Sequence, residues 1–278
     1  MTAALLARKT THFLLFCALA IVGVCFLAPF VWGIFATFKT NREIVAIPLQ
    51  FFPKSFNFDN YVAMAQSVDV GRAFINSLIV SSVITASVLF TSTIAGYVFS
   101  KHRFPGRNLI FFALLTTMML PLYVKLIPTY LVVARLGFTK NHLGLIVPYL
   151  SIPYGIFLVR QYMLGIPSSF VDSARIDGAK EMGIYWRIIV PQCMPIISAL
   201  AIFTFMQQWN NFLWPLVVAE NRKLFTLTLM LGMLSSRISV EYNVVLSGAV
   251  VSIIPTIIVY SIFQKQFVRG ITLTGLKG

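Results

Sequence analysis

The sequence is poor in charge, and acidic residues are its scarcest charged type. Asp and Glu together number 8 in 278 residues, and charged residues of both signs make up 11% of the chain. A typical soluble domain carries about a quarter charged residues. So few charges cannot cover the surface of a soluble protein of this size, which argues against a soluble enzyme. The composition is also too apolar for a disordered chain.

The usual metal-site and hydrolase patterns are missing as well. The three cysteines, Cys17, Cys25 and Cys193, form no Cys-x-x-Cys pair, so neither a disulfide framework nor a zinc site is expected, and we expect them to be small apolar fillers. The sequence contains no His-Glu-x-x-His and no Gly-x-Ser-x-Gly motif. We therefore expect no catalytic residues and no metal ligands.

A nucleotide site and a proton relay are equally unsupported. Gly178 and Gly183 have the spacing of a phosphate-binding loop, but Ile184 and Tyr185 follow where Lys and Ser or Thr would be needed. No Asp or Glu lies inside any of the apolar runs described below, so a carboxylate relay across a membrane is not expected. The chain is expected to bind no cofactor of its own.

Long hydrophobic runs are what the chain has instead. Hydrophobic residues make up 58% of it, and its mean hydropathy is +0.84. A bilayer-spanning helix needs about 20 apolar residues, and six segments meet that length: Phe13–Ala36, Phe74–Ser100, Leu109–Ala134, Leu143–Met163, Pro195–Ala219 and Val244–Phe263. The sequence therefore predicts an all-α polytopic membrane protein with six transmembrane helices.

The basic residues give these helices an orientation. The net charge is +14, but no basic stretch is long enough to follow a nucleic-acid backbone. The short loop Lys101–Arg107 is wholly basic, and basic loops face the cytoplasm. Both termini are then cytoplasmic. A cleaved signal peptide is the alternative for the first run, because Arg8 and Lys9 precede it, but the run is longer than a signal sequence needs.

The predicted organisation has four parts and one special loop. Residues 1–36 form the cytoplasmic N-terminus and first transmembrane helix, and residues 37–73 form an extracytoplasmic loop that we expect to fold as a cap. Residues 74–267 form the core with five helices and a cytoplasmic loop at 164–192. Residues 268–278 form a cytoplasmic tail.

The loop at 164–192 reads as helix, turn, helix. Ser169 with Asp172 has the spacing of a capping box, and Gly178 suits a left-handed helix end. A second short helix follows, with apolar residues at helical spacing: Met182, Tyr185, Trp186 and Ile189. Such a pair can rest on lipid headgroups or dock onto another protein. Small residues at Ser173, Ala174, Gly178 and Ala179 favour docking.

This loop resembles the Glu-Ala-Ala loop of ABC importer permeases. Asp172-Ser173-Ala174 stands for Glu-Ala-Ala, Arg175-Ile176-Asp177-Gly178-Ala179 matches closely, and Ile189-Val190-Pro191 stands for the end of the pattern. Further pieces resemble carbohydrate-type permeases like the maltose G subunit: Phe38–Ile44, Asn60-Tyr61, Asn76-Ser77, Ala95–Tyr97, Arg103–Arg107, Met118–Pro121, Trp209–Leu216, Phe267–Thr272 and Gly275–Gly278.

The resemblance implies a type I ABC importer transmembrane domain in a bacterial or archaeal inner membrane. Its implied partners are a second permease, two ATPase subunits that bind ATP and Mg²⁺, and an extracytoplasmic solute-binding protein. Residues that match the coupling helix of the family are Asp172, Ser173, Ala174, Arg175, Ile176, Asp177, Gly178 and Ala179.

A polar stripe marks a second candidate site. Gln207, Asn210, Asn211 and Trp214 have i, i+3, i+4, i+7 spacing, so they would share one face of the fifth span. Amides could bind sugar hydroxyls while the Trp stacks on a ring. The alternative is contact with the partner permease, because amides also join helices in membranes.

Lys125 is the ionisable residue within the third span. It lies about 17 residues from the predicted cytoplasmic start, roughly 25 Å along a helix, which places it near the outer face. It could snorkel, serve an outer gate or hold an acidic substrate. Among the tyrosines, Tyr97, Tyr149 and Tyr154 are possible pathway liners, with the interfacial belt as the alternative.

These features predict a permease subunit that imports a sugar, oligosaccharide or polyol. An importer of the same build for an anion, such as glycerol phosphate or an acidic oligosaccharide, stays open because of Lys125. An ion-coupled secondary carrier is the alternative from another class, and the missing intramembrane carboxylates count against it.

Overall fold

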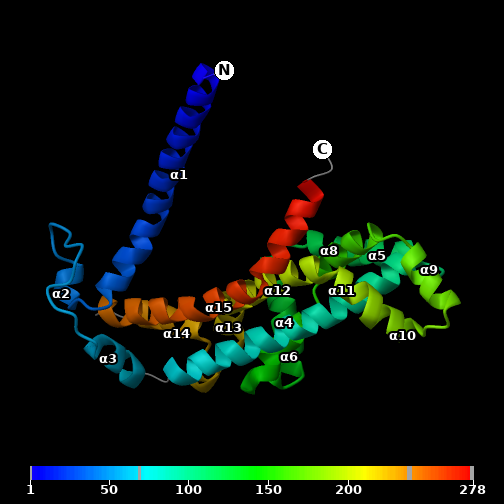
Figure 1. Cartoon of the computed structure of the whole chain (residues 1–278). Coiled ribbons are helices and arrows are strands. Elements are labelled where there is room, and N and C mark those ends of the chain that lie inside the picture. Colours follow the sequence, from blue (N-terminus) through cyan, green and yellow to red (C-terminus); the bar gives the residue numbers. More distant parts are fainter. Residues whose placement is uncertain (1, 68–69, 237–239, 276–278) are drawn as a thin grey trace. The chain divides into compact units, whose positions relative to one another are not determined.

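The structure is a computed structural model that describes residues 2–67, 70–236 and 240–275, and the side chains of residues 11–66, 70–236 and 240–267. Throughout these ranges all regular structure is helical, as predicted (Figure 1). The side chains of the predicted tail, residues 268–278, lie outside the described part.

Four helices are long and apolar enough to cross a membrane: Thr11–Ala36, Val70–Lys101, His142–Leu164 and Tyr242–Phe267. Two further apolar helix pairs are sharply bent, by 104° and 76°. The described residues therefore hold up to six spans if each bent pair is one span, which is compatible with the predicted number.

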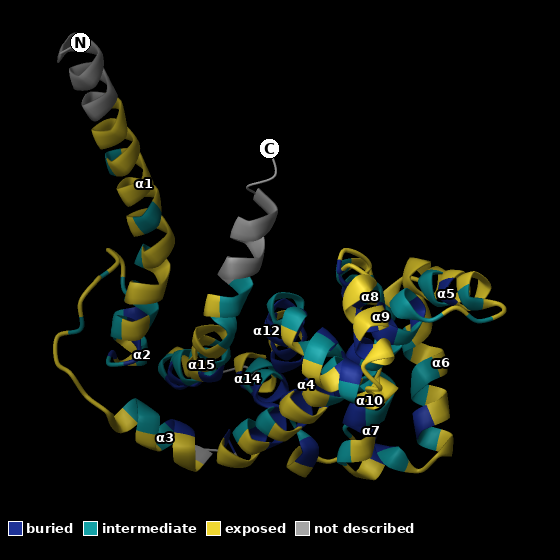
Figure 2. Ribbon diagram, turned by 45° about the vertical axis from the view of Figure 1, so that its right-hand side comes forward, coloured by how far each residue is buried: buried dark blue, intermediate teal, exposed yellow. Residues whose placement is uncertain are grey.

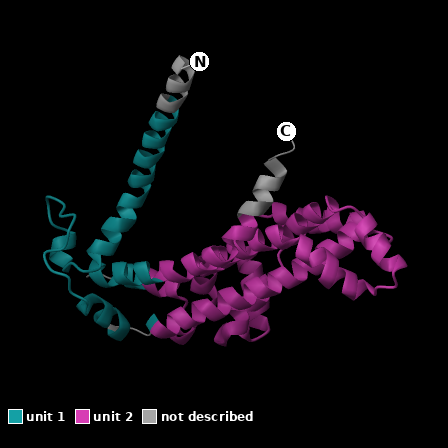
Figure 3. Ribbon diagram, in the orientation of Figure 1, with its two compact units in different colours: residues 1–70, 233–251 teal, residues 71–232, 252–278 magenta. Residues whose placement is uncertain are grey.

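The chain divides into two compact units (Figure 3). Unit 1 comprises residues 1–70 and 233–251, and unit 2 comprises residues 71–232 and 252–278. Both candidate sites predicted from the sequence lie in unit 2.

Unit 1 contains one long apolar helix and the loop after it. Its helices are α1 (Thr2–Ala36), α2 (Asn41–Ile44), α3 (Asp59–Ser67), the end of α14 (Leu227–Ser235) and the first part of α15 (Tyr242–Gly275). Most described apolar side chains of α1 are exposed (Figure 2), as expected of a helix whose surroundings are lipid tails.

The loop after α1 is folded around one asparagine. Asn60 Nδ2 donates hydrogen bonds to the carbonyls of Thr37 (2.7 Å) and Lys39 (2.9 Å), and Asn60 Oδ1 accepts one from Asn243 Nδ2 (2.7 Å). Aromatic rings pack edge-on beside this point, for example Phe35 with Phe52 at 5.1 Å between centroids. The long loop is therefore ordered by specific contacts.

Unit 2 is a bundle built on three helices, α4 (Val70–Lys101), α8 (Pro153–Leu164) and α12 (Met194–Trp209). Its core includes Ile84, Val88, Val159, Ile189 and Leu200. The remaining helical elements are α5 (Arg107–Thr116), η1 (Thr117–Met119), α6 (Leu122–Arg135), η2 (Phe138–Lys140), α7 (His142–Ile146), η3 (Val147–Tyr149), α9 (Ser169–Ile176), α10 (Glu181–Ile184), the π-helical η4 (Tyr185–Ile189), α11 (Val190–Gln192), α13 (Leu213–Val218), η5 (Arg222–Leu224), the first part of α14 and the later part of α15.

Helices α4 and α8 touch through small residues. A Cβ added at Gly155 would collide with the Ser92 side chain, and one at Gly96 would come within 2.8 Å of Val159 Cγ1. Ser92 and Gly96 are one turn apart on α4, as Gly155 and Val159 are on α8. Small residues at this spacing let two backbones approach closely where no water drives the helices together.

The predicted third span, Leu109–Ala134, is not a straight helix. Its two halves, Arg107–Met119 and Leu122–Arg135, meet at 104°. Leu120 is extended (φ −74°, ψ 121°) and Pro121 follows it. A proline lacks an N–H and pushes the preceding residue out of helical conformation. The position estimated for Lys125 assumed a continuous helix, so that estimate does not apply to this bent segment.

The predicted fifth span, Pro195–Ala219, is also broken. Helix α12 ends at Trp209, residues 210–212 are not helical, and α13 begins at Leu213. Side chains satisfy the backbone groups at the break: Thr228 Oγ1 donates to the Trp209 carbonyl at 2.9 Å, and the Trp214 N–H donates to Asn211 Oδ1 at 3.3 Å. Such replacement bonds are required where irregular backbone lies at membrane depth.

Candidate functional site

Helix α9 is a short amphipathic helix at one end of unit 2, next to α10 (Figure 1). It buries Val171 and Ala174 against the bundle, while Phe170 and Ile176 stay exposed at 50% and 86%. The apolar side predicted for this helix is therefore divided between core and surface. Of the matched coupling residues, Ala174 is buried and the others are exposed.

The capping box predicted at Ser169 does not form. Helix α9 begins at Ser169, so its N-cap is Ser168, whose side chain makes no capping hydrogen bond. Asp172 instead lies 3.4 Å from Arg175 Nη1, one turn further along the same helix. The carboxylate thus faces a cation on its own helix rather than the N-terminal amides.

The predicted turn at Gly178 is confirmed. Gly178 has φ +79°, the left-handed region that glycine enters without steric cost. The Gly178 N–H donates to the Arg175 carbonyl at 3.0 Å, and the Ala179 N–H donates to the Ala174 carbonyl at 2.9 Å. These two bonds form a Schellman motif, which fixes the direction in which the chain leaves α9.

Glu181, the first residue of α10, is a contact point that the sequence analysis did not find. Its carboxylate is 2.6 Å from Arg175 Nε and 3.4 Å from His102 Nε2, and it accepts a 2.8 Å hydrogen bond from the Tyr97 hydroxyl. The neighbouring Arg175 holds the pKa of the Glu181 carboxyl below its usual value. One carboxylate therefore connects α9, α10 and the end of α4.

Two more contacts attach this loop to α4. Tyr185 and Thr93 share a buried 2.7 Å hydrogen bond between their hydroxyls. Lys101 Nζ donates to the carbonyl of Ile166, which precedes α9. The loop at 164–192 is thus held to α4 at several points.

The second candidate site is a cavity of about 340 Å³ beside the break after α12. All four predicted stripe residues line it, Gln207, Asn210, Asn211 and Trp214, together with Leu122, Tyr123, Leu126, Tyr149, Gln208, Phe212 and Leu213. The prediction that the four share one helical face is wrong, because the helix ends at Trp209. The chain brings them together by bending around the cavity.

Trp214 has a structural role in this cavity wall. It is buried, and its indole N–H donates to the Gly144 carbonyl at 3.1 Å. Its ring meets that of Tyr149 at 6.0 Å in an edge-on arrangement. Asn210 is exposed by comparison. The amides are therefore the more available polar groups, with Tyr149 as the aromatic neighbour.

Lys125 lines an adjoining cavity of about 140 Å³, with Leu122, Leu126, Thr129, Pro148, Tyr149 and Trp214. Four of these residues also line the larger cavity. Of the possible aromatic liners, Tyr149 borders both cavities, whereas Tyr97 is buried against Glu181 and Tyr154 is exposed. Sequence spacing could not separate these three tyrosines.

A membrane-type helical bundle with a firmly attached two-helix loop and a polar cavity at a broken helix has the features of a transport subunit. The family model described as "Binding-protein-dependent transport system inner membrane component" matches residues 87–273. The chain belongs to this family and is a permease subunit of a binding-protein-dependent importer.

Similar proteins include permeases for several solutes. The chain is 36% identical to the arabinooligosaccharides transport system permease protein AraQ of Bacillus subtilis, over 92% of each chain. It is 31% identical to the lactose transport system permease protein LacG of Rhizobium radiobacter, over 95% of this chain and 96% of LacG. It is 30% identical to the sn-glycerol-3-phosphate transport system permease protein UgpE of Pectobacterium atrosepticum, over 90% and 92%.

The fold is also that of a solved transporter. A chain from the crystal structure of a bacterial ABC transporter involved in the import of the acidic polysaccharide alginate matches with a TM-score of 0.81. The match covers 94% of this chain and 98% of that chain at 24% identity.

Proposed function

We propose that this chain forms half of the translocation pathway for a sugar, oligosaccharide or polyol. The other half is a second, different permease chain, two ATPase subunits bind ATP and Mg²⁺, and an extracytoplasmic binding protein delivers the solute. The observation that carries the choice of solute is the cavity of about 340 Å³ beside α12.

The lining of this cavity suits a neutral polyhydroxyl solute. Gln207, Asn210 and Asn211 supply amide donors and acceptors, and no charged residue is among its lining residues. Amides can pair with hydroxyls in either direction, and Tyr149 offers an aromatic edge or face. Two of the similar permeases are named for the transport of arabinooligosaccharides and lactose.

We place the ATPase contact on residues 172–179, which include the exposed Ile176, with the exposed Phe170 beside them. A short rigid helix that is attached to α4 through Glu181 can pass ATPase closure to the bundle as a rigid-body movement. This assignment makes the loop and both termini cytoplasmic, in the inner membrane of a bacterium or archaeon. The wholly basic loop Lys101–Arg107 supports that orientation.

A second candidate solute is an anion. Lys125 lines the cavity that adjoins the amide-lined one, and UgpE is named for sn-glycerol-3-phosphate transport. An ammonium group at this point would favour a phosphate or carboxylate on the solute.

A pull-down tests the assembly. The tagged full chain, extracted in mild detergent, should co-purify with a second permease-sized chain and an ATPase. Gly178→Arg should lose the ATPase and retain the partner permease, because it alters the helix end without touching the bundle. A wild-type chain that purifies alone would contradict the proposal and favour a secondary carrier.

Uptake by the reconstituted complex, supplied with its binding protein, tests the solute. Asn210→Ala should reduce uptake of an arabinooligosaccharide about fivefold, the loss expected for one hydrogen bond, while Lys125→Gln leaves it unchanged. The opposite result would establish the anion as the solute. In that case the wild-type complex takes up glycerol 3-phosphate but no neutral sugar, and Lys125→Gln abolishes this uptake.

A further inference from the structure

The basic loop after α4 is held in a defined turn. Phe104 to Arg107 form a β-turn in which the Arg107 N–H donates to the Phe104 carbonyl at 3.3 Å. Pro105 takes the second position and Gly106 the third, with φ +77° and ψ −1°, which is the type II geometry. The Phe104 ring packs against Phe99 at 5.9 Å. The turn is therefore anchored, with Arg103 directly before it and Arg107 as its last residue.

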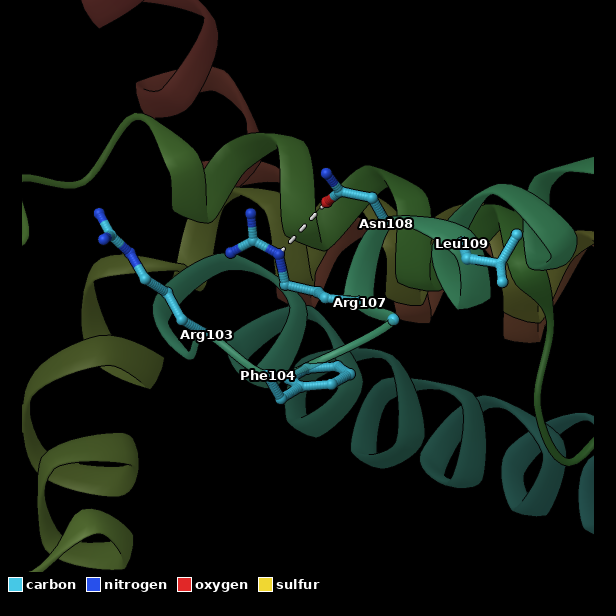
Figure 4. Close-up of a pocket in the computed structure, with 6 residues that line it drawn as sticks. Arg103, Phe104, Arg107, Asn108 and Leu109 are labelled. Atoms are coloured by element: carbon cyan, nitrogen blue, oxygen red, sulfur yellow. Dashed lines mark hydrogen bonds between the residues drawn. The ribbon is translucent and has the colours of Figure 1, made fainter.

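The side chains of Arg103, Arg107 and Asn108 extend to the same side of this turn (Figure 4). They border an open cavity of about 420 Å³, lined by Arg103, Phe104, Gly106, Arg107, Asn108 and Leu109. Two guanidinium groups at one cavity suit an anionic ligand with several oxygens, because a guanidinium binds phosphate through two parallel hydrogen bonds.

The positive charge at this cavity has no counterion within the described part of the chain. Arg107 Nη1 donates to the His102 carbonyl at 3.1 Å, and its Nε lies 3.4 Å from Asn108 Oδ1, but neither Arg103 nor Arg107 forms an ion pair there. Arg103 makes no hydrogen bond to any described residue. Arg160, whose guanidinium lies 4.0 Å from the centre of the Phe111 ring, is a further cation and not a counterion for these arginines.

The helix that follows the cavity is apolar and exposed. Leu109, Ile110 and Phe112 of α5 are 73%, 51% and 64% exposed. A cationic pocket directly followed by exposed apolar side chains matches a phospholipid, whose charged headgroup is joined to acyl chains. An acidic surface of a docked protein would satisfy the arginines but not this apolar side.

We propose that Arg103 and Arg107 bind the phosphate of an anionic phospholipid in the leaflet that this loop faces. The acyl chains then lie along the exposed side of α5. The site is separate from the solute cavity and does not depend on which solute is imported.

Native mass spectrometry of the assembled transporter tests this site. The purified complex is titrated with phosphatidylglycerol or with phosphatidylcholine of the same acyl chains. Arg103→Gln should weaken phosphatidylglycerol binding about fivefold, and Arg103→Gln with Arg107→Gln about 30-fold, following the contribution of one basic residue near an anionic surface. Phosphatidylcholine binding should not change.

Arg135→Gln with Arg222→Gln is the matched control, because it removes the same net charge at two exposed positions elsewhere. It should leave phosphatidylglycerol binding unchanged, and an equal loss would reduce the effect to net charge and overturn the proposal. The single variant Arg103→Gln controls for misfolding, because the Arg103 side chain contacts no described polar group and its loss should not disturb the fold.

Two further outcomes would reject a lipid. Inorganic phosphate that binds as tightly as phosphatidylglycerol, with the same dependence on both arginines, would make the cavity a site for a soluble anion. Loss of the ATPase subunit from the Arg103→Gln complex, with lipid binding unchanged, would make it a protein-docking surface. Failure of inorganic phosphate to displace the lipid at equal concentration is the expected result.

Discussion

The Tyr97 hydroxyl and the Glu181 carboxylate are joined by a 2.8 Å hydrogen bond. The residues are 84 positions apart in the sequence, one near the end of α4 and the other at the start of α10. Because Glu181 also contacts Arg175 of α9, this bond is part of a polar connection between the exposed helix α9 and α4 of the bundle.

Tyr97→Phe should weaken the connection between α9 and α4. The change removes the hydroxyl but keeps the ring packed against Tyr185 and His102. Hydrogen bonds to charged groups contribute about 1.5–3 kcal/mol, so we expect several-fold less solute-dependent ATPase activity in the reconstituted complex, with basal ATPase activity retained. Tyr154→Phe is the control, because Tyr154 is 44% exposed. Equal losses in both variants would refute this role for the Tyr97–Glu181 bond.

Gly178→Ala should destabilise the loop, whereas Gly183→Ala should not. Gly178 has φ +79°, where a Cβ costs roughly 1–2 kcal/mol. Gly183 lies within α10, and a Cβ there would meet no atom within 4 Å. Hydrogen exchange of the amides of α9 measures the difference: faster exchange is expected in the first variant alone. Similar exchange in the two variants would show that the left-handed turn does not hold α9 in place.

Gly155→Ala should lower the thermal stability of the purified chain, because its Cβ would collide with Ser92. Overpacking of this kind typically costs about 1–3 kcal/mol. Adding Ser92→Ala should recover part of the loss, since it removes the Oγ atom, which has no hydrogen-bond partner among the described atoms. Gly71→Ala is the control. Gly71 lies on α4, the helix that carries Ser92, and a Cβ there would meet no atom within 4 Å, so thermal stability should not fall. If the double variant regains no thermal stability, the strain caused by Gly155→Ala does not come from contact with Ser92 Oγ.

Trp214→Phe and Asn210→Ala should separate structural from functional residues in the cavity. Trp214 is buried and hydrogen-bonded to the Gly144 carbonyl, so its replacement should lower the melting temperature in detergent. Asn210→Ala should reduce uptake without a change in melting temperature, because Asn210 is exposed and, among the described residues, its Nδ2 donates only to the Met206 carbonyl near the end of α12. The reverse pattern would contradict the assignment of the amides to the solute.

Part of this structure can be predicted from short stretches of the sequence. The apolar runs predict the helical segments because span length is set by the bilayer, and Gly178 predicts its own turn because a left-handed helix end strongly favours glycine. These features depend on neighbouring residues alone. The resemblance in the loop at 164–192 is local in the same sense.

Long-range features could not be predicted. The contacts of Glu181 with Tyr97 and His102 depend on how α4 and the loop pack, which spacing does not reveal. The bend at Pro121 had a signal, the proline itself, but prolines also occur inside intact helices here, such as Pro29 in α1 and Pro255 in α15. The break after Trp209 has no glycine or proline at residues 210–212, so the polar residues there read as one helical face.

The close approach of α4 and α8 also constrains how the protein can move. Helices separated only by Ser92, Gly96, Gly155 and Val159 cannot slide past each other by a fraction of a turn without steric overlap. We therefore expect α4 and α8 to move together as one rigid body. The bending needed to switch between outward-open and inward-open states must then occur at positions outside this pair. The bend at Leu120–Pro121, the 76° bend between Gln192 and Met194 and the non-helical residues 210–212 are interruptions of this kind. Leu122, which follows the bend at Leu120–Pro121, and residues 210–212 line the cavity of about 340 Å³, so bending at these two interruptions would also open and close its walls.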